Sequence, residues 1–347
     1  MTLILAGDIG GTRARFALCD AKSRRVVHEE VLESRTFTTF EKALARFLEV
    51  AKKAVKKKLD IRAATFGIAG PVVNQRVKTT NLPWVIDGTA IEKSFDLGPV
   101  TLFNDLVAIG FGALASPANK VKVLRLGRPK KAGGNIAVIA AGTGLGEAIF
   151  VWDGKRHVPC ATEGAHVDFA PRNDVEADLL ASLRAEHGHV SYERVASGST
   201  IGAVYRFFVH EQGVKESKEA AAKIAQSQDP NPVIVDLAEK GKSEAAMRAI
   251  ELWSGVYGSE AGNLALKGLA MGGVYICGGV SGRLANVLAN GLAARRTKKK
   301  SLSPFLEGFI EKGRMRHLLE KMPIALCTEP RAGLIGAAAH ASSVLQS

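Results

Sequence analysis

Two stretches of this sequence follow one plan, and this internal repetition limits the fold more than any other feature. Residues 3–18 (LILAGDIGGTRARFAL) and 135–150 (NIAVIAAGTGLGEAIF) each contain a strand, a glycine-rich turn and a second strand. Gly10 and Gly142 occupy equivalent places, and the paired glycines Gly10 and Gly11 permit positive φ. The repeat predicts two similarly built domains, each offering a turn of backbone N–H groups to one ligand, for which phosphate is the obvious candidate.

The rest of the chain alternates between strand-like and helix-like segments. Thr38 and Glu41 have capping-box spacing at the start of a helix that continues to residue 55, and residues 245–266 and 333–343 also read as helices. The last of these is rich in Ala and Gly and is expected to pack tightly across the domain junction. Residues 175–240 read as a polar, mainly helical insertion, with a connection at 226–235 that contains Pro230 and Pro232. Further strands are expected at 25–32, 63–68, 100–103 and 274–277, so the pattern indicates an α/β fold.

Composition excludes several classes of protein. The 347 residues are 46% hydrophobic, which is enough for one or two packed cores, yet no run of eighteen apolar residues occurs. The N-terminal stretch MTLILAGDIGG has no basic region ahead of its apolar residues, so we expect neither secretion nor a membrane span. The four cysteines are far apart and show no C-x-x-C spacing. They suggest neither a metal site nor a disulfide framework, and they fit a reducing cytoplasm.

The net charge of +13 is concentrated in two runs, residues 52–58 (KKAVKKK) and 295–300 (RRTKKK). We interpret the first as the solvated end of a helix and the second as a surface loop, since cations are favoured near helix C-termini. Neither run contains the aromatic residues on which bases stack, so nucleic acid is not an expected partner. A polyanionic ligand remains an alternative.

Three glycine-rich turns carry the features that phosphoryl transfer needs, which are N–H donors around phosphate and a carboxylate near the metal. Residues 7–12 (GDIGGT) place Asp8 at a strand end beside such a turn, and 141–146 (AGTGLG) is a second turn in which Thr143 adds a hydroxyl. The third, 277–282 (CGGVSG), follows a strand and precedes a helix. Each could also be an ordinary structural turn, and their combination favours ATP.

Four polar residues stand out as candidates for binding and catalysis. Asn104 and Asp105 end an apolar strand and precede a helix, where a carboxylate can accept a proton from an attacking hydroxyl. The alternative is that Asp105 merely caps that helix. Glu163 and His166 lie close together in a glycine-bearing loop, and the alternative for them is a surface ion pair.

The three turns resemble, in order and spacing, the phosphate-1, phosphate-2 and adenosine motifs of the superfamily of actin, hexokinase and the Hsp70 chaperones. Further segments resemble bacterial glucokinases over nearly the whole chain; they are 80–84 (TNLPW), 103–105 (FND), 163–171 (EGAHVDFAP) and 188–198 (GHVSYERVASG). The resemblance implies two actin-like (ribonuclease H-like) α/β domains with a central cleft. One would be residues 1–113 completed by the helix 331–347, and the other 114–330 with a helical insertion.

The resemblance also implies roles for individual residues. Asp105 would be the catalytic base, and the sugar would be held by Asn81, Asn104, Asp105, Glu163, His166 and Glu193. Glu193 depends on the resemblance, because by itself SYERVASG could be a helix start with a solvent-facing acid. Asp8 would act on Mg²⁺, through water. ATP would be bound by Gly7, Asp8, Ile9, Gly10, Gly11, Thr12, Gly142, Thr143, Gly144, Gly278 and Gly279.

Two details refine the resemblance. No cysteine lies near His166, so a structural zinc site is not expected there, and the chain resembles the zinc-free glucokinases rather than the repressor and kinase family with a cysteine-rich zinc motif. Ala165 stands where many relatives have a second glycine, which puts the shape of that loop in question.

The expected activity is transfer of phosphate from ATP, with Mg²⁺, to the 6-hydroxyl of D-glucose. The product, glucose 6-phosphate, would enter glycolysis in the cytoplasm. We expect the cleft to close around the sugar during the reaction. The expected partners are therefore small molecules, with neither nucleic acid nor membrane, and the resemblance suggests a homodimer. Alternatives are another hexose, polyphosphate as donor, or a sugar-responsive regulator without catalysis. Against the regulator, no helix-turn-helix segment precedes Leu3.

Overall fold

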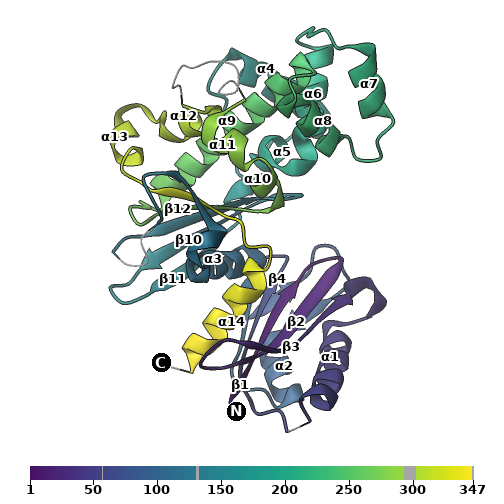
Figure 1. Cartoon of the computed structure of the whole chain (residues 1–347), viewed down its shortest axis with the longest axis vertical. Coiled ribbons are helices and arrows are strands. Elements are labelled where there is room, and N and C mark those ends of the chain that lie inside the picture. The colour runs from purple at the N-terminus through teal and green to yellow at the C-terminus, as the bar shows by residue number, and fades with distance from the viewer. Residues whose placement is uncertain (57, 130–132, 293–301, 346–347) are drawn as a thin grey trace. The chain divides into compact units, whose positions relative to one another are not determined.

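The computed structural model describes residues 1–56, 58–129, 133–292 and 302–345. The chain divides into two compact units, Met1–Val121 with Glu329–Ser347, and Lys122–Thr328. Figure 1 shows the first unit in purple and blue with the yellow C-terminal helix, and the second in colours that run from blue-teal through green to yellow-green. The basic run at residues 295–300 lies outside the described residues.

The first unit is built on a five-stranded sheet in the order β3-β2-β1-β4-β7. Strands β1, β2 and β3 are antiparallel neighbours, and β4 and β7 continue the sheet in parallel. A hairpin of β5 and β6 stands beside it. The strands are β1 (Leu3–Ile9), β2 (Arg13–Asp20), β3 (Val26–Glu33), β4 (Ile61–Ile68), β5 (Arg76–Lys78), β6 (Val85–Asp87) and β7 (Val100–Asn104).

Helices cover the two faces of this sheet. Helix α1 (Phe40–Val55) packs its apolar residues into an aromatic core around Phe16, where Phe40, Phe47 and Phe66 make ring contacts. On the other face, α14 (Ala332–Val344) packs its alanines against β1 and β4 and lies beside α3 (Asp105–Ala115). Small side chains let this last helix approach the sheet closely. The remaining helix is α2 (Gly88–Phe95).

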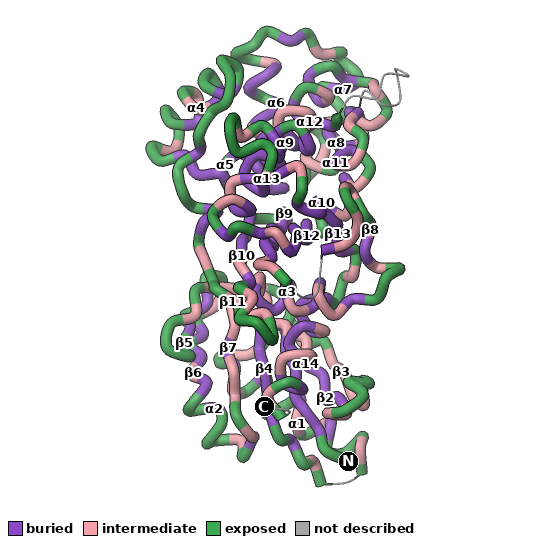
Figure 2. Tube along the Cα trace, turned by 90° about the vertical axis from the view of Figure 1, so that its left-hand side faces the viewer, coloured by how far each residue is buried: buried purple, intermediate pink, exposed green. Residues whose placement is uncertain are grey.

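The second unit repeats the plan of the first in the sheet order β11-β10-β9-β12-β13-β8. Again three strands are antiparallel and the next two are parallel, so β9 and β10 correspond to β1 and β2. Every residue of β9 and β12 is buried, as the purple tube in Figure 2 shows. The strands are β8 (Val121–Arg125), β9 (Ile136–Ala141), β10 (Leu145–Trp152), β11 (His157–Thr162), β12 (Gly273–Cys277) and β13 (Ile324–Cys327).

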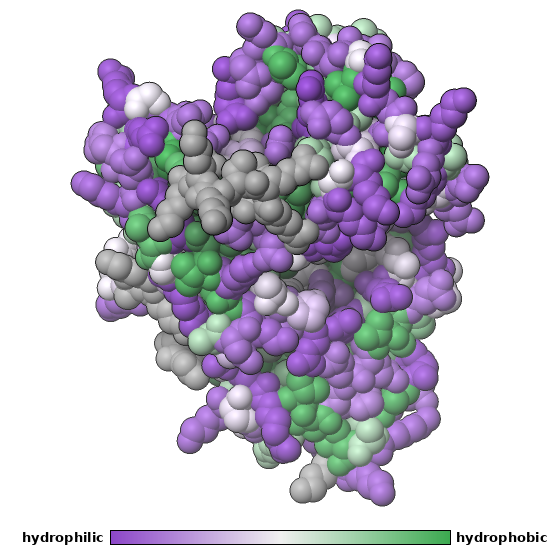
Figure 3. All heavy atoms as spheres, turned by 45° about the horizontal axis from the view of Figure 1, so that its top comes forward, coloured by the Kyte–Doolittle hydropathy of each residue, from purple (hydrophilic) through white to green (hydrophobic). Residues whose placement is uncertain are grey.

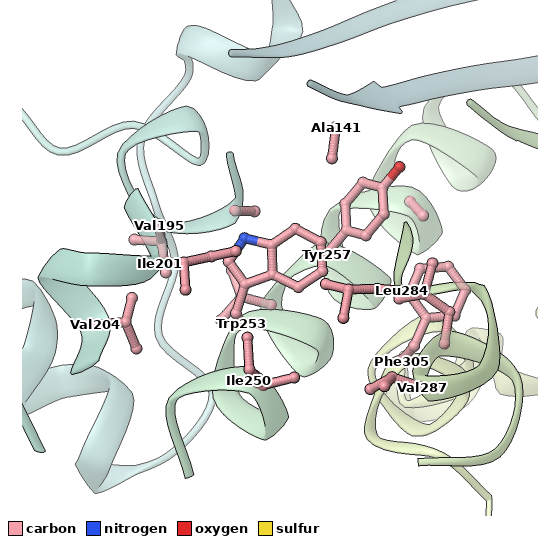
Figure 4. Packing of buried hydrophobic residues seen from close by; sticks show 14 of the residues in the cluster. Ala141, Val195, Ile201, Val204, Ile250, Trp253, Tyr257, Leu284, Val287 and Phe305 are labelled. Carbon is pink, nitrogen blue, oxygen red and sulfur yellow. The ribbon is translucent and has the colours of Figure 1, made fainter. Parts of the chain in front are cut away.

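The core of the second unit centres on the long helix α9 (Glu244–Lys267). Its Trp253 and Tyr257 are fully buried and pack with residues of α6, α11 and α12 (Figure 4). The Trp253 indole donates to the Ser197 carbonyl at 2.9 Å, so this core also fixes the chain before α6. The other helices are α4 (Asp174–His187), α5 (Glu193–Ala196), α6 (Ile201–His210), α7 (Lys218–Ala225), α8 (Pro230–Glu239), α10 (Gly279–Arg283), α11 (Ala285–Asn290), α12 (Pro304–Ile310) and α13 (Arg316–Leu319).

The expected strands and long helices are all present, but two helix starts differ from expectation. Helix α1 is capped by Thr39, whose hydroxyl accepts from the N–H of Lys42 at 3.3 Å, rather than by Thr38. Residues 230–235 form the start of α8 instead of a connection, because Asp229 caps the helix and Pro230 occupies its first position, where no N–H is needed. The run at 52–58 does fall at a helix end, since Lys52 and Lys53 lie in the last turn of α1.

The face of the molecule in Figure 3 is mostly hydrophilic, with hydrophobic side chains in small separate groups. Among the described residues, no helix has the length and apolar character needed to cross a bilayer.

Candidate active site

Near the end of β1, Asp8 contacts two other elements of the first unit, β2 and α14. Asp8 lies opposite Arg15 on β2 and against the start of α14, where a Cβ on Gly333 would stand 3.0 Å from its carboxylate carbon. Burial raises the pKa of Asp8, and the charge of Arg15 opposes that shift. A nearby cation would therefore stabilise the ionised form of this carboxylate.

Gly10 and Gly11 are both outside the positive-φ region, contrary to expectation. The Gly10 N–H donates to the Arg13 carbonyl at 2.9 Å, so it is already used within the turn. Gly11 is required for space, since a Cβ there would lie 2.7 Å from Cβ of Asn81. The exposed Asn81 is thereby placed directly against this turn. Gly7 and Ile9 lie within β1, and Thr12 is exposed at the end of the turn.

Asn104 and Asp105 lie at the junction of β7 and α3. The sequence left open that Asp105 merely caps this helix, but the structure shows a different cap. Asn104 is the N-cap: its side-chain oxygen accepts from the N–H of Leu106 at 2.8 Å, and its amide donates to the Gly70 carbonyl at 3.1 Å. Asp105 is the first residue of the helix and accepts from the same N–H at 3.0 Å. Because the neighbouring residue is the cap, capping alone does not explain a carboxylate at Asp105.

In the second unit, the turn between β9 and β10 is tied to Glu193, the first residue of α5. The Glu193 carboxylate accepts from the N–H of Leu145 at 2.9 Å. A Cβ on Gly144 would come within 2.5 Å of the same carboxylate oxygen, so glycine is needed there. The Gly142 N–H donates to the Gly144 carbonyl at 2.9 Å and, like that of Gly10, is used inside its own turn. Glu193 is half-buried rather than solvent-facing.

Glu163, His166 and Glu193 come together at one place in the second unit. The His166 ring nitrogens lie 3.9 Å from a Glu163 carboxylate oxygen and 3.8 Å from one of Glu193. The Glu163 and His166 side chains are each 56% exposed, so a ligand can reach their polar atoms. These distances exceed those of good hydrogen bonds, so the facing polar atoms can also reach a ligand.

The loop that carries Glu163 and His166 forms one 3-10 turn, Gly164–His166. Ala165 is 2% exposed and adopts negative φ, so it fits this turn without strain and contributes to the core. Alanine at position 165, where the resemblance implied a second glycine, is therefore compatible with the loop.

The third turn follows β12 and forms one wall of a pocket. Gly278 has φ of 92° and caps α10 (Gly279–Arg283). The pocket has a volume of about 430 Å³, in the range usual for small-molecule sites. Its walls come from the second and third turns, the chain before α6 and the start of α8, and the residues are Gly142, Thr143, Gly198, Ser199, Ile201, Asp229, Asn231, Pro232, Val235, Gly279, Val280, Arg283 and Leu284.

Comparison with known proteins shows the family of the chain. The sequence matches the Glucokinase family over residues 5–344. The chain belongs to the glucokinase family. A curated glucokinase of Nostoc punctiforme is 35% identical over 97% of this chain and 98% of its own length, and one of Marinobacter nauticus is 36% identical over 96% and 95%. The predicted family, kinase activity and glucokinase function are confirmed.

Solved structures agree on the fold. A glucokinase from an Antarctic psychrotroph is 31% identical, with a TM-score of 0.78, over 98% of this chain and 99% of that one. A glucokinase of the repressor and kinase family from Streptomyces griseus, in complex with glucose and AMPPNP, has a TM-score of 0.59 at 21% identity, which supports the fold alone. The predicted two-domain actin-like α/β fold is confirmed.

Sequence reasoning missed part of the pocket of this glucokinase-family protein. Ser199, Asp229, Asn231 and Arg283 line it but were not among the predicted ATP-binding residues. Asp229 and Asn231 belong to the segment interpreted as a connection. The available signal was Asp229 directly before Pro230, which is typical of a helix N-cap followed by N1 proline.

Proposed function

We propose that this chain transfers the γ-phosphoryl group of ATP to the 6-hydroxyl of D-glucose, with Asp105 as the base. The observation that carries the proposal is the bond from Leu145 N–H to Glu193, which connects the glycine turn expected at phosphate directly to a residue expected at the sugar. A kinase must hold the phosphoryl donor and the sugar acceptor at a fixed distance and orientation. The bond between Leu145 and Glu193 links the two proposed binding segments within the second unit.

In this proposal Asp105 accepts the proton of the 6-hydroxyl while that oxygen attacks the γ-phosphorus. The new oxygen–phosphorus bond forms as the bond to the β-phosphate oxygen breaks, and ADP leaves. Asn104 would hold the sugar beside the base, because its side chain is fixed by the cap and by the Gly70 carbonyl. Glu163, His166, Glu193 and Asn81 would bind the other hydroxyls.

We propose that Mg²⁺ is bound mainly by phosphate and water, with one carboxylate of the protein. Among the described residues, no group of three or more His, Cys, Asp or Glu side chains could enclose a metal ion. Mg²⁺ in kinases typically keeps several waters and takes only one or two carboxylates. Asp8 would be that carboxylate, and the ion would neutralise phosphate charge when bound.

Glu163→Gln is expected to raise the KM for glucose about tenfold or more while kcat falls much less. The amide keeps the size of the side chain but loses the charged acceptor, which contributes ~1.5–3 kcal/mol per hydrogen bond. Initial rates at varied glucose concentration measure this. Glu186→Gln is the matched control, because Glu186 also lies beside a histidine, His187, at 3.6 Å. An unchanged glucose KM would remove Glu163 from the sugar site.

Gly279→Leu is expected to raise the KM for ATP about tenfold with little change in the KM for glucose. Gly279 lines the pocket, and no atom lies within 4 Å of the position its Cβ would occupy, so a leucine would fill space assigned to adenosine. Gly282→Leu is the control, because it also has open space around its Cβ but is not a lining residue. Polyphosphate has no adenosine, so neither Gly279→Leu nor Gly282→Leu should change the rate of phosphorylation from polyphosphate.

Substrate identity is tested by a panel of glucose, mannose, fructose, glucosamine and N-acetylmannosamine, each with ATP and with polyphosphate. We expect glucose with ATP to have the highest kcat/KM. A higher value for another sugar, or for polyphosphate, would overturn that part of the proposal. The four cysteines form no disulfide, which supports the proposed work in a reducing cytoplasm. The proposed homodimer is tested by the mass in solution.

A further inference from the structure

Two buried carboxyl groups face each other beneath the candidate sugar-binding residues of the second unit. Glu147 on β10 is 2% exposed and Glu260 on α9 is 0% exposed. Neither oxygen of Glu147 meets a donor among the described residues, and the group in hydrogen-bonding range is the Glu260 carboxyl. Two carboxyl groups can hydrogen bond only when one of them carries a proton.

The surroundings indicate which carboxyl holds that proton. Burial and the charge of Glu260 raise the pKa of Glu147 to about 8. Burial also raises the pKa of Glu260, but Asn263 donates to its carboxylate at 2.8 Å and the Lys267 ammonium lies 3.4 Å away. The anion is therefore stabilised on Glu260, and Glu147 is the protonated partner at neutral pH.

Glu147 contacts the loop that carries Glu163 and His166. It is the register partner of Thr162 on β11, whose hydroxyl accepts from the N–H of Gly164 at 3.0 Å. Gly164 lies so close to the Glu147 carboxyl that no Cβ would fit there. A change in the charge or position of Glu147 therefore acts directly on the backbone between Glu163 and His166.

Glu260 is connected to the segment that carries Glu193. The Asn263 amide that bonds to Glu260 also donates to the Tyr192 hydroxyl at 3.0 Å, and Tyr192 directly precedes Glu193. Glu193 in turn bonds to Leu145, two residues before Glu147. One buried polar network thus contacts both segments that hold the candidate sugar ligands.

We propose that Glu147 and Glu260 share one proton and act as a positioning pair for Glu163, His166 and Glu193, so that loss of the proton weakens glucose binding. The proposal rests on the proposed assignment of those three residues to the sugar. Neither carboxyl touches the reacting atoms.

The sign of the expected pH effect follows from the raised pKa of Glu147. Below about pH 8 the pair keeps its proton and the loop keeps its shape. Above it, two adjacent anions repel each other in a buried site. Among the described residues, the other charged or titratable groups near this network include Lys267, Tyr192, Tyr257, Lys312, Arg172 and Cys277. Burial raises the pKa of Tyr192 to about 12 and also raises that of Tyr257, so neither ionises in this range.

Lys312 titrates in the same pH range as Glu147, because burial lowers the pKa of its ammonium group to about 8. It bonds to the Ser259 hydroxyl at 2.8 Å and senses Glu260, Glu176, Arg172 and Lys267. Loss of its charge would also act on Glu260 in the same pH range. A variant in which only one of the two groups can titrate separates their effects.

The experiment measures the glucose KM of the full chain from about pH 6.5 to about pH 9.5. In the unmodified enzyme the KM should rise by up to about tenfold per pH unit above about pH 8. Glu147→Gln keeps a neutral donor against Glu260 and cannot ionise, so its KM should match within about twofold at neutral pH and stay flat to about pH 9.5. The control Glu244→Gln, an exposed residue of the same helix as Glu260, should follow the unmodified enzyme.

An alkaline rise in glucose KM that is the same in Glu147→Gln as in the unmodified enzyme would overturn the proposal and point to Lys312. If Glu147→Gln does not fold, Lys312→Arg answers the question, because the guanidinium stays charged over the whole pH range. A rise in glucose KM that persists in Lys312→Arg supports Glu147, and a rise that disappears overturns the proposal. Glu163→Gln is measured in the same series. If it leaves the KM unchanged at neutral pH, the proposed sugar site fails; if it raises the KM while Glu147→Gln follows the unmodified enzyme, only the positioning pair fails.

Discussion

Asp105→Ala is expected to lower kcat by about a hundredfold to ten-thousandfold, the usual contribution of a general base, while glucose still binds. The loss arises because no other group accepts the proton of the 6-hydroxyl as it attacks phosphorus. Asp105 is also the first residue of α3, so removing its carboxylate costs about 0.3–1 kcal/mol at the positive end of the helix dipole. Turnover under saturating ATP and glucose measures the loss of kcat, and calorimetry measures whether glucose still binds.

The matched control for this experiment is Asp174→Ala. Asn173 caps α4 through a bond to the N–H of Glu176, and Asp174 is the first residue of that helix, as Asp105 is of α3. The control therefore loses the same charge at the same helix position without entering the candidate site. Near-normal kcat in Asp105→Ala, or an equal loss in Asp174→Ala, would reject Asp105 as the base.

Gly278→Ala is expected to destabilise the folded chain by about 3–5 kcal/mol. An L side chain is strained by about 1–3 kcal/mol at the φ of 92° found here, and overpacking adds a comparable cost. The added Cβ would collide with the backbone of Ala141, the last residue of β9 and the first of the second glycine turn. Denaturant unfolding of the variant, with the midpoint and slope compared, measures this loss.

Gly282→Ala is the control for that substitution. It lies within α10, the short helix that Gly278 precedes as N-cap, has negative φ and has no atom within 4 Å of its Cβ position. It should be neutral or stabilising by about 0.5–1 kcal/mol, the usual gain from alanine in a helix. A Gly278→Ala midpoint equal to that of Gly282→Ala would show that the close packing of the two turns does not limit stability.

The regular elements were readable from the sequence because each depends on local periodicity. The strands on either side of Gly10 and Gly142 alternate or run apolar, and α9 has the expected spacing over most of its length. The exact caps were less accessible. Thr38 and Thr39 are chemically equivalent, and only the path of the chain into the core decides which hydroxyl meets the N–H of Lys42.

The candidate site, like the fold, was predicted only in part from the sequence. Glycine density correctly marked the turns but suggested conformational freedom as the reason, whereas Gly11 and Gly144 are needed because Asn81 and Glu193 stand against them. These contacts join residues 70 and 49 positions apart, respectively, and no local pattern encodes such a distance. For the same reason the wall of the pocket that comes from Asp229 and Asn231 was not predicted.

By itself, the sequence determined the duplicated strand, turn and strand plan, the α/β class and the residue types that can bind phosphate and sugar. These features depend on backbone periodicity and on motif chemistry, which are local. Only the tertiary structure decided that Asn104 rather than Asp105 is the cap, that Glu193 is bonded to the second glycine turn, and that Glu147 and Glu260 meet beneath it. Each of these depends on which distant side chains share a buried, low-dielectric space, because there an unpaired polar group or charge must find a partner or a proton.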